Sequence, residues 1–410
     1  MKKLFLLGTC VLTMQYNFAR TIGVGTFSFG KNARAYIDQI FYTKRLSYGP
    51  FLKQFESLFA KTHESKFCVS SNSGTSSLQV ALQALKEIHD WQDGDEVIVP
   101  AVTFVATSNI VLHNNMNPVF VDVDPDYYEL DPALIEQAIT PKTRAIIPVH
   151  LFGQPCDMDP IRAIAQKHNL KIIEDSCETM LAKYKGESVG NLGDIGCFST
   201  YVAHLLITGV GGLATTSNPE YAIKMRSLVN HGRDSIYMSI DDDKNISNDQ
   251  LKEVIARRFS FVSIGHSFRI TELEGALGLA QLEELDSIVA KRRANAAYLT
   301  KHLKDLQSYI QLPKIRKDTE HSFMMFPIVI KNMPKTKLVN YLEEHGIETR
   351  DMLPLINQPI YVKKFGIKKG DYPVADWINE NGFYVGCHQD LTQEDLDYIV
   401  AIIHNFFKME

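Results

Sequence analysis

The stretch Gly193-Asp-Ile-Gly-Cys-Phe-Ser199-Thr-Tyr-Val-Ala-His204-Leu-Leu-Ile-Thr-Gly-Val-Gly-Gly212 holds a short apolar strand, a turn and a glycine-rich exit. The strand ends in Ser199, and His204 lies in the turn five residues later. After the exit, Leu213-Ala-Thr-Thr216 continues as another strand. Polar residues at a strand end and in the turn behind it are typical of ligand sites in α/β proteins. We therefore take Ser199 and His204 as candidate site residues.

On the amino-terminal side of this stretch, apolar runs alternate with helical patterns. The runs are rich in Val and Ile, mostly without alternation, which is typical of strands buried on both faces of a mostly parallel sheet. They are Glu96-Val-Ile-Val-Pro100, Pro118-Val-Phe-Val-Asp-Val-Asp124, Ala145-Ile-Ile-Pro-Val-His150 and Lys171-Ile-Ile-Glu-Asp175. Helices at about 104–114, 131–139 and 158–168 complete an α/β pattern. The carboxyl ends of these strands, where ligands bind, carry Phe104, His150, Asp175 and Ser199.

A further strand, Lys66-Phe-Cys-Val-Ser70, leads into a loop of small residues that opens a helix. Gly74, Thr75 and Ser76 lie at the start of this helix. The backbone N–H groups at a helix N-terminus and the positive end of its dipole attract anions, so these residues are a candidate phosphate cradle. A purely structural helix cap is the alternative, because such residues are preferred as N-caps.

The length of 410 residues predicts two domains. Thr271-Glu-Leu-Glu274 is a capping-box pattern and predicts a long amphipathic helix towards Leu303, while residues 239–249 read as an exposed loop. The pattern changes at about residue 315 to a smaller α+β unit. We therefore predict an N-terminal lead-in (1–44), a large cofactor-binding domain ending in a long connecting helix (45–314) and a small domain (315–410).

Composition limits the possible partners. A net charge of -5 without a long Lys/Arg run argues against nucleic acid. The six cysteines are scattered and have no metal-ligand spacing, so we expect free thiols, no metal site and a cytoplasmic location. The first thirteen residues superficially resemble a secretory signal, but no convincing cleavage site follows and the apolar run is too short to span a bilayer. We expect an N-terminal extension and no membrane association.

Seven ordered motifs give the chain a family resemblance. They are Ser73-Gly-Thr-Ser-Ser-Leu78, Val99-Pro-Ala-Val-Thr-Phe-Val-Ala-Thr107, Val119-Phe-Val-Asp-Val-Asp124, His150-Leu-Phe-Gly-Gln-Pro155, Ile173-Glu-Asp-Ser-Cys-Glu178, Gly193-Asp-Ile-Gly-Cys-Phe-Ser199 and Phe268-Arg-Ile-Thr-Glu-Leu-Glu-Gly-Ala-Leu-Gly-Leu-Ala-Gln-Leu282. In order and spacing they resemble the DegT-type sugar aminotransferase and dehydratase family. The resemblance implies an aspartate-aminotransferase-like fold and a homodimer with shared active sites. It also implies pyridoxal or pyridoxamine phosphate as cofactor and a nucleotide-sugar substrate.

The resemblance also implies roles for individual residues. Ser199 and the start of the helix at Gly74, Thr75 and Ser76 would hold the cofactor phosphate, and Phe104 would stack on the ring. Asp175 would keep the ring nitrogen protonated, which makes the ring a better electron sink. Two of the implied residues depart from the family pattern: Glu178 stands where the family has Gln or His in contact with the ring hydroxyl, and Ser267 stands where it has Asn in contact with the partner's phosphate. Arg269 would contact the substrate or the phosphate, and His388 would lie near the substrate.

His204 stands at the offset where the family has its lysine. An imidazole cannot hold pyridoxal phosphate covalently, but it can act as a general base near neutral pH. A subgroup of the family resembles this exchange: its members use pyridoxamine phosphate to remove the C3 hydroxyl of nucleotide-linked 4-keto-6-deoxyhexoses. Some rely on an iron–sulfur cluster, which needs clustered cysteines, and others recover the amine from glutamate. The scattered cysteines favour the iron-free route.

Two alternatives remain beside this 3-dehydratase hypothesis. One is the same cofactor chemistry on another keto sugar, because fold and cofactor site do not determine the sugar. The other is a catalytically silent homologue with a binding or regulatory role, because a lost lysine is also what such a protein would show.

Overall fold

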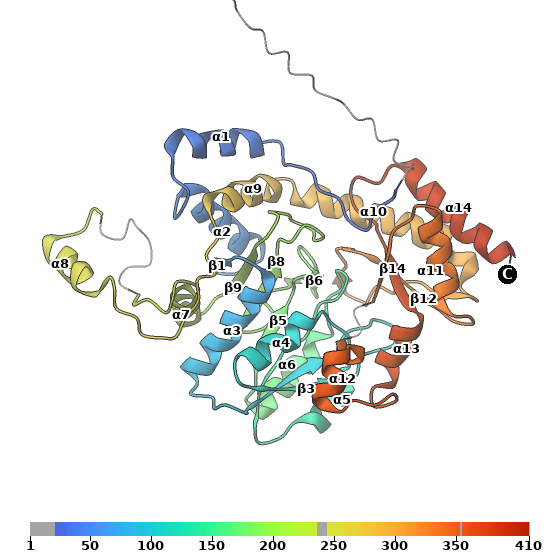
Figure 1. Ribbon diagram of the computed structural model, residues 1–410, viewed down its shortest axis with the longest axis horizontal. Helices are drawn as coiled ribbons and strands as arrows, with labels where there is room; N and C mark the ends of the chain where they lie inside the picture. Colours follow the sequence, from blue (N-terminus) through green and yellow to red (C-terminus); the bar gives the residue numbers. More distant parts are fainter. Residues whose placement is uncertain (1–20, 236–243, 353–354, 410) are drawn as a thin grey trace, which may run out of the picture.

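The computed structural model describes residues 21–235, 244–352 and 355–409 (Figure 1). Its centre is a seven-stranded sheet in the order β1-β9-β8-β5-β4-β2-β3. The strands are β1 (Phe67–Ser71), β2 (Glu96–Pro100), β3 (Asn117–Val121), β4 (Thr143–Ile146), β5 (Lys171–Asp175), β8 (Ile195–Ser199) and β9 (Gly212–Thr216). β9 runs antiparallel to both neighbours, and the pairs from β8 to β3 are parallel. The predicted mostly parallel sheet is confirmed.

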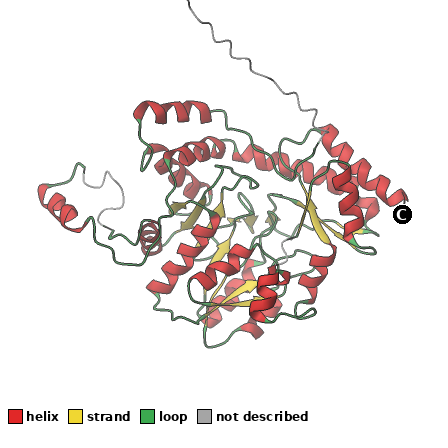
Figure 2. Ribbon diagram, viewed as in Figure 1, coloured by secondary structure: helices red, strands yellow, loops and turns green. Residues whose placement is uncertain are grey.

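The helices between residues 33 and 302 mostly lie around this sheet (Figure 2). They are α1 (Ala33–Thr43), α2 (Pro50–Thr62), α3 (Gly74–Ile88), α4 (Val105–His113), α5 (Pro132–Ile135), α6 (Met158–His168), α7 (Pro219–Val229), α8 (Asn248–Arg257), α9 (Glu272–Leu282) and α10 (Leu285–His302). On β2, Ile98 packs into the hydrophobic cluster of α2 and α6, whereas Val97 and Val99 pack into that of α3, α4 and α7. The strands are therefore buried on both faces, as their unbroken apolar runs predict.

The carboxyl-terminal part forms a second sheet and core. Its antiparallel sheet has the order β10-β12-β14-β13, with β10 (Ile310–Gln311), β12 (Phe326–Ile330), β13 (Thr349–Asp351) and β14 (Gly382–Val385). Its helices are α11 (Lys335–Glu344), α12 (Pro359–Phe365), α13 (Pro373–Asn381) and α14 (Gln393–Met409). A small third sheet joins β6 (Lys183–Tyr184), β7 (Glu187–Ser188) and β11 (Thr319–Glu320). The core of the second unit also takes in Ile22, Ala296 and Leu299, so hydrophobic packing crosses the boundary predicted at residue 315.

Two local predictions need correction. The helix expected from Thr271 to Leu303 is two helices, α9 and α10, although the predicted capping box at Thr271 is present. At the break, Glu283 accepts hydrogen bonds from Asn32 and Tyr36, so the lead-in to α1 binds the point where the helix direction changes. Of the loop expected over 239–249, residues 239–243 lie outside the described residues, and α8 begins at Asn248 within the rest. Helix α8 stands away from the sheet (Figure 1).

The lead-in is also structured beyond expectation. Helix α1 packs on α9, and a parallel bridge joins Ile22 to Ile347 in the second unit. The expected N-terminal extension at residues 1–20 lies outside the described residues. Among the described helices, none is long and apolar enough to cross a membrane.

Candidate active site

A cavity of about 360 Å³ lies at the carboxyl ends of the central strands. It brings together most of the predicted site residues: Gly74, Thr75, Phe104, Asp175, Glu178, Ser199 and His204. We call it the His204 cavity. Its wall also includes Met324, Met325 and Tyr384 from the second unit, so both units of the chain enclose it.

His204 enters this cavity from the turn after β8. Its Nδ1 lies 3.3 Å from the carbonyl oxygen of Ser199. Because a carbonyl oxygen only accepts hydrogen bonds, this contact assigns the ring proton to Nδ1 and leaves the lone pair on Nε2. Burial lowers the pKa of His204 to about 4, and the positive charge of Arg292 acts in the same direction. The imidazole is therefore a neutral base at pH 7.

Asp175 ends β5 and is almost fully buried, with 4% of its surface exposed. Its carboxylate accepts hydrogen bonds from Thr107 Oγ1 at 2.8 Å and from the backbone N–H of Cys177 at 3.2 Å. Burial raises the pKa of Asp175, while these two donors oppose that rise. An acceptor group held in this way is suited to receive a hydrogen bond from a ligand in the cavity.

Glu178 lies three residues after Asp175, in the turn that follows β5, and it lines the same cavity. One carboxylate oxygen accepts a hydrogen bond of 3.0 Å from the backbone N–H of Phe152. Burial raises the pKa of Glu178 to about 7, and the nearby charge of Asp175 adds to the effect. Glu178 can therefore exchange a proton near neutral pH, which the amide of the family's Gln cannot do.

The start of α3 forms another side of the cavity. Ser73 caps the helix and accepts a hydrogen bond from the Ser76 N–H at 3.1 Å, and Gly74 is its first residue. A Cβ on Gly74 would lie 2.7 Å from both Cys177 Sγ and Ser199 Cβ, so only glycine fits between the helix and the strand ends. Gly74 and Thr75 thus present a helix N-terminus to the cavity, as an anion site requires.

Ser76 faces a different partner. Its hydroxyl donates to Asn72 Oδ1 at 2.7 Å, and its side chain does not belong to the cavity wall. Of the residues predicted to hold a phosphate, Gly74, Thr75 and Ser199 line the cavity and Ser76 does not. Phe104, by contrast, is 57% exposed at the cavity, which leaves a ring face for stacking.

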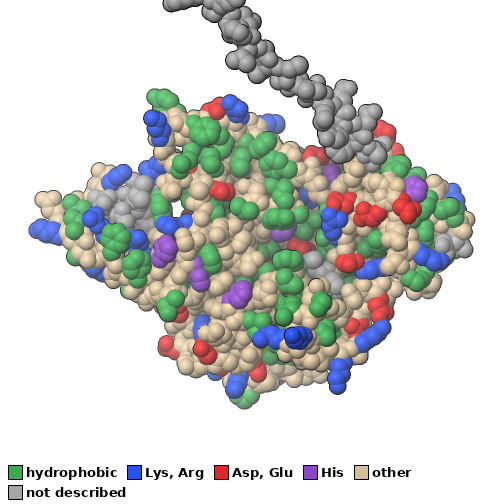
Figure 3. Space-filling view, in the orientation of Figure 1, with side chains coloured by type: hydrophobic (Ala, Val, Ile, Leu, Met, Phe, Trp, Pro, Cys, Tyr) green, Lys and Arg blue, Asp and Glu red, His purple; other side chains and the backbone are tan. Residues whose placement is uncertain are grey.

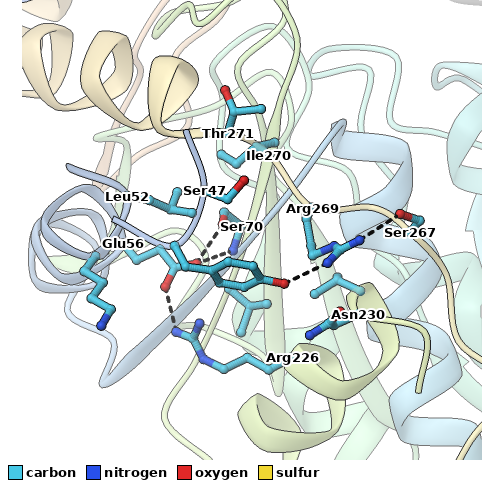
Figure 4. A pocket seen from close by; sticks show the side chains of 14 residues that line it. Ser47, Leu52, Glu56, Ser70, Arg226, Asn230, Ser267, Arg269, Ile270 and Thr271 are labelled. Atoms are coloured by element: carbon cyan, nitrogen blue, oxygen red, sulfur yellow. Dashed lines mark hydrogen bonds and ion pairs between the residues drawn. The ribbon is translucent and has the colours of Figure 1, made fainter. Parts of the chain in front are cut away.

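Ser267 and Arg269 lie in a second cavity of about 470 Å³, which we call the Arg269 cavity (Figure 4). Both side chains are exposed, and Arg269 donates to Ser267 Oγ at 3.3 Å and to Tyr48 Oη at 2.8 Å. The turn that carries Tyr48 is fixed by Glu272, whose carboxylate accepts from Gly49 N at 2.8 Å. The chain therefore does not bring Ser267 and Arg269 to its own His204 cavity.

His388 and His150 lie outside the wall of the His204 cavity as well. His388 is 6% exposed, and burial together with the charge of Arg292 lowers its pKa to about 4. His150 is fully buried, and its Nε2 lies 2.9 Å from Glu174. The substrate contact predicted for His388 thus has no support in its position in this chain.

Sequence reasoning missed three residues of the cavity wall, and it missed Thr107, which lies behind the wall. Thr107, which binds Asp175, is the last residue of the motif Val99–Thr107 and lies one helical turn after Phe104. That spacing could have indicated that Thr107 lies next to the site residues. Met324, Met325 and Tyr384 come from the second unit, and nothing in their local sequence points to the cavity.

Comparisons with known proteins identify relatives of this chain. Residues 28–404 match the model of the DegT/DnrJ/EryC1/StrS aminotransferase family. The chain is 34% identical to the GDP-perosamine synthase of Caulobacter vibrioides over 91% of this chain and 94% of that protein. It is 30% identical to the GDP-4-keto-6-deoxy-D-mannose 3-dehydratase of Escherichia coli O55:H7, over 90% of this chain and 95% of the relative.

Solved structures give the same relationship. The E. coli GDP-4-keto-6-deoxy-D-mannose 3-dehydratase with bound hydrated pyridoxal phosphate superposes with a TM-score of 0.84 at 27% identity, covering 93% of this chain and 98% of that one. The predicted aminotransferase-like fold is thereby confirmed. The family is described as one of aminotransferases, and one relative is named a dehydratase, so the similarity alone does not choose between the two activities.

Proposed function

This chain belongs to the DegT/DnrJ/EryC1/StrS aminotransferase family, and on that premise we propose that it is a pyridoxamine-phosphate-dependent 3-dehydratase of a nucleotide-linked 4-keto-6-deoxyhexose. The observation that carries the proposal is His204, a neutral imidazole in the cavity with its lone pair on Nε2, five residues after Ser199, where the resemblance to the family leads us to expect a lysine. A histidine there accepts protons but cannot form the covalent link to the cofactor that a lysine forms.

The residues of the His204 cavity fit the cofactor. The N-terminus of α3 at Gly74 and Thr75, which lies at the cavity wall together with Ser199, suits a phosphate. Phe104 offers an exposed ring face, and Asp175 offers a buried carboxylate for a protonated ring nitrogen. When bound, pyridoxamine phosphate supplies an amine that condenses with a keto group and a ring that accepts electrons.

In this proposal, His204 Nε2 would take up a proton in the cavity and return it to the leaving C3 hydroxyl, so that this oxygen would depart as water. A base inside the cavity contributes about 10²–10⁴-fold to such a step. Glu178, with a pKa of about 7, can donate or accept a hydrogen bond at the ring hydroxyl. Met324, Met325 and Tyr384 close the wall and reduce access of water.

We also propose a homodimer in which Ser267 and Arg269 act on the partner's site. Both lie in a separate, open cavity of their own chain. Phe29, Phe41 and Tyr42 are exposed by 66%, 64% and 88%, and hydrophobic side chains gather over α1 and α9 in Figure 3. An apolar face of this kind is typical of a protein interface. A cytoplasmic location, glutamate as amino donor and an iron-free reaction belong to the same proposal.

The retained cofactor residues speak against a catalytically silent homologue, because a protein that only binds a partner needs neither the buried Asp175 nor the narrow fit at Gly74. The main competitor is amine transfer, the activity in the description of the family. It would place an amino group on the sugar and leave its C3 hydroxyl intact.

The test is to incubate the purified protein with pyridoxamine phosphate, glutamate and GDP- or CDP-linked 4-keto-6-deoxyhexoses, and to analyse the sugars by mass spectrometry. We expect loss of the C3 oxygen. An aminated sugar would overturn the proposal in favour of transfer. A panel of other nucleotide-linked keto sugars identifies the substrate, and failure of all of them, with no cofactor bound, would support the silent homologue.

A further inference from the structure

The loop from Tyr201 to Gly209, which we call the His204 loop, carries His204 between β8 and β9. Its base is closed by a backbone bridge between Tyr201 and Gly209. Just outside this bridge, the backbone N–H of Thr208 donates to the carbonyl oxygen of Thr200 at 2.9 Å, and the two threonine hydroxyls lie 2.6 Å apart. The base of the loop is therefore fixed, and His204 lies in the part of the loop beyond it.

One side chain of α9 binds this loop beyond His204. Gln281 lies in the last turn of α9 and is 4% exposed. Its Oε1 accepts from the backbone N–H of Ile207 at 2.9 Å, and its Nε2 donates to the carbonyl oxygens of Ile207 at 2.8 Å and of Ser28 at 3.2 Å. The amide of Gln281 thus holds both backbone polar groups of a residue three positions after His204, and it ties the loop to the lead-in.

The polar character of Gln281 needs a reason, because a buried amide costs free energy unless its hydrogen bonds are made. Apolar contacts alone already anchor the loop, since Leu205 and Leu206 are buried in the hydrophobic core. Such contacts have no direction. The paired hydrogen bonds to Ile207 are directional, so they fix the path of the backbone as well as its depth.

The path of this backbone determines how the imidazole meets Ser199. The backbone N–H of His204 donates to the carbonyl oxygen of Tyr201 at 3.0 Å, and the two rings meet edge to face with centroids 5.9 Å apart. His204 Nδ1 lies 3.3 Å from the Ser199 carbonyl oxygen, at the long end for a hydrogen bond. A small shift of the loop would break this contact, and the ring proton would then be shared between Nδ1 and Nε2.

We propose that Gln281 is a positioning residue for His204. Its amide holds the His204 loop so that the Nδ1 proton stays on the Ser199 carbonyl oxygen and the lone pair stays on Nε2, which is the form that accepts a proton in the cavity. The purpose of this role rests on the proposed function, but the tautomer of His204 is a property of the ligand-free protein and is measured without substrate.

The test is ¹⁵N NMR of the ligand-free protein with labelled histidine, assigned by the His204→Asn variant, because the nitrogen shifts show which ring nitrogen carries the proton. In wild type we expect the proton on Nδ1. Gln281→Met keeps the length of the side chain but removes all three hydrogen bonds, so we expect a mixture of tautomers. Turnover should fall roughly 10–100-fold at unchanged cofactor affinity, because the base is misplaced. Gln281→Asn, whose amide is one methylene too short, should give the same result if Gln281→Met does not fold.

Asn114 provides a matched control. It is 7% exposed, its Nδ2 donates to the carbonyl oxygen of Ile110 at 2.8 Å, and it is not part of the His204 cavity wall. Asn114→Leu removes a buried amide just as Gln281→Met does, but it should leave the tautomer of His204 and the turnover unchanged.

An unchanged tautomer in the folded Gln281 variants, or an equal change in Asn114→Leu, would overturn the role of Gln281. A tautomer change that is confined to the Gln281 variants supports this role even if no sugar is dehydrated. Failure of the positioning role and failure of the proposed function are therefore distinguishable.

Discussion

The His204 cavity and the Arg269 cavity differ in how the chain builds them. The first lies among strand ends, and its polar groups Asp175 and Ser199 are 4% and 5% exposed. The second lies between the turn at Tyr48 and the segment before α9, and its Ser267 and Arg269 are exposed. Polar groups that are buried interact strongly with the charges of a ligand, which favours catalysis. Exposed polar groups near an exposed apolar surface are typical of a site that a second copy of the chain completes.

The largest expected effect is at His204. His204→Asn keeps a polar side chain but removes the base, so dehydration should fall by about 10²–10⁴-fold while cofactor binding is retained. Turnover and the absorbance of bound cofactor measure the two properties separately. In the converse variant, His204→Lys, added pyridoxal phosphate should form a covalent, visibly absorbing adduct. A variant that stays colourless would contradict the alignment of His204 with the family's lysine.

The second prediction tests whether the Arg269 cavity serves a partner. Arg269→Ala alone should reduce activity with little change in folding, because the side chain is exposed. When this variant is mixed with His204→Asn, hybrid dimers contain one intact site and should recover about a quarter of wild-type activity. Recovery is measured after co-refolding or co-expression. If the mixture stays as inactive as its parts, Arg269 acts within its own chain and the proposed shared site is wrong.

The same difference explains how much the sequence could predict. Apolar runs in the sequence identify the central strands, and the parallel topology places the carboxyl ends of these strands at one edge of the sheet. The residues at or just after these strand ends include Gly74, Phe104, Asp175 and Ser199. Met324 and Tyr384 are far along the chain, and only tertiary packing brings them to the cavity. Arg292 stands in the polar run Lys291-Arg-Arg-Ala, which reads as a solvated helix face, yet it is buried.

The ends of helices were hardest to predict where the side chains that stabilise them come from distant parts of the sequence. The break between α9 and α10 has neither proline nor glycine at Glu283-Glu284, and the side chains that bind Glu283 there, Asn32 and Tyr36, are distant in sequence. Helix α1 was missed for a related reason, because its buried residues Ala33 and Ile40 form a short apolar pattern that is stabilised by packing on α9.

The third prediction concerns the narrow fit in the His204 cavity. Gly74→Ala places a Cβ 2.7 Å from Cys177 Sγ and Ser199 Cβ, which overpacks the start of α3. We expect a loss of about 1–3 kcal/mol in the free energy of unfolding and weaker binding of pyridoxamine phosphate. Gly25→Ala is the control, because its nearest contact would be an ordinary 3.6 Å to Ala203 Cα. Denaturant melts and cofactor titration measure both effects, and equal behaviour of the two variants would contradict the assigned fit.

The smallest expected effect is the pH dependence of stability. Burial lowers the pKa of His63, His204 and His388 to about 4 in the folded chain. The unfolded chain has ordinary histidines with a pKa of about 6.5, so below that value it binds more protons than the folded chain. The stabilisation by these groups is complete above pH 6.5 and is lost as the pH falls towards 4, by about 1.4 kcal/mol per pH unit for each histidine.

Urea melts between pH 7.5 and 5 measure this slope, and His63→Phe should reduce it by one histidine's share. His63 stacks on Phe59, packs against Phe198 and is not part of the His204 cavity wall, so that variant should leave the dehydration rate unchanged.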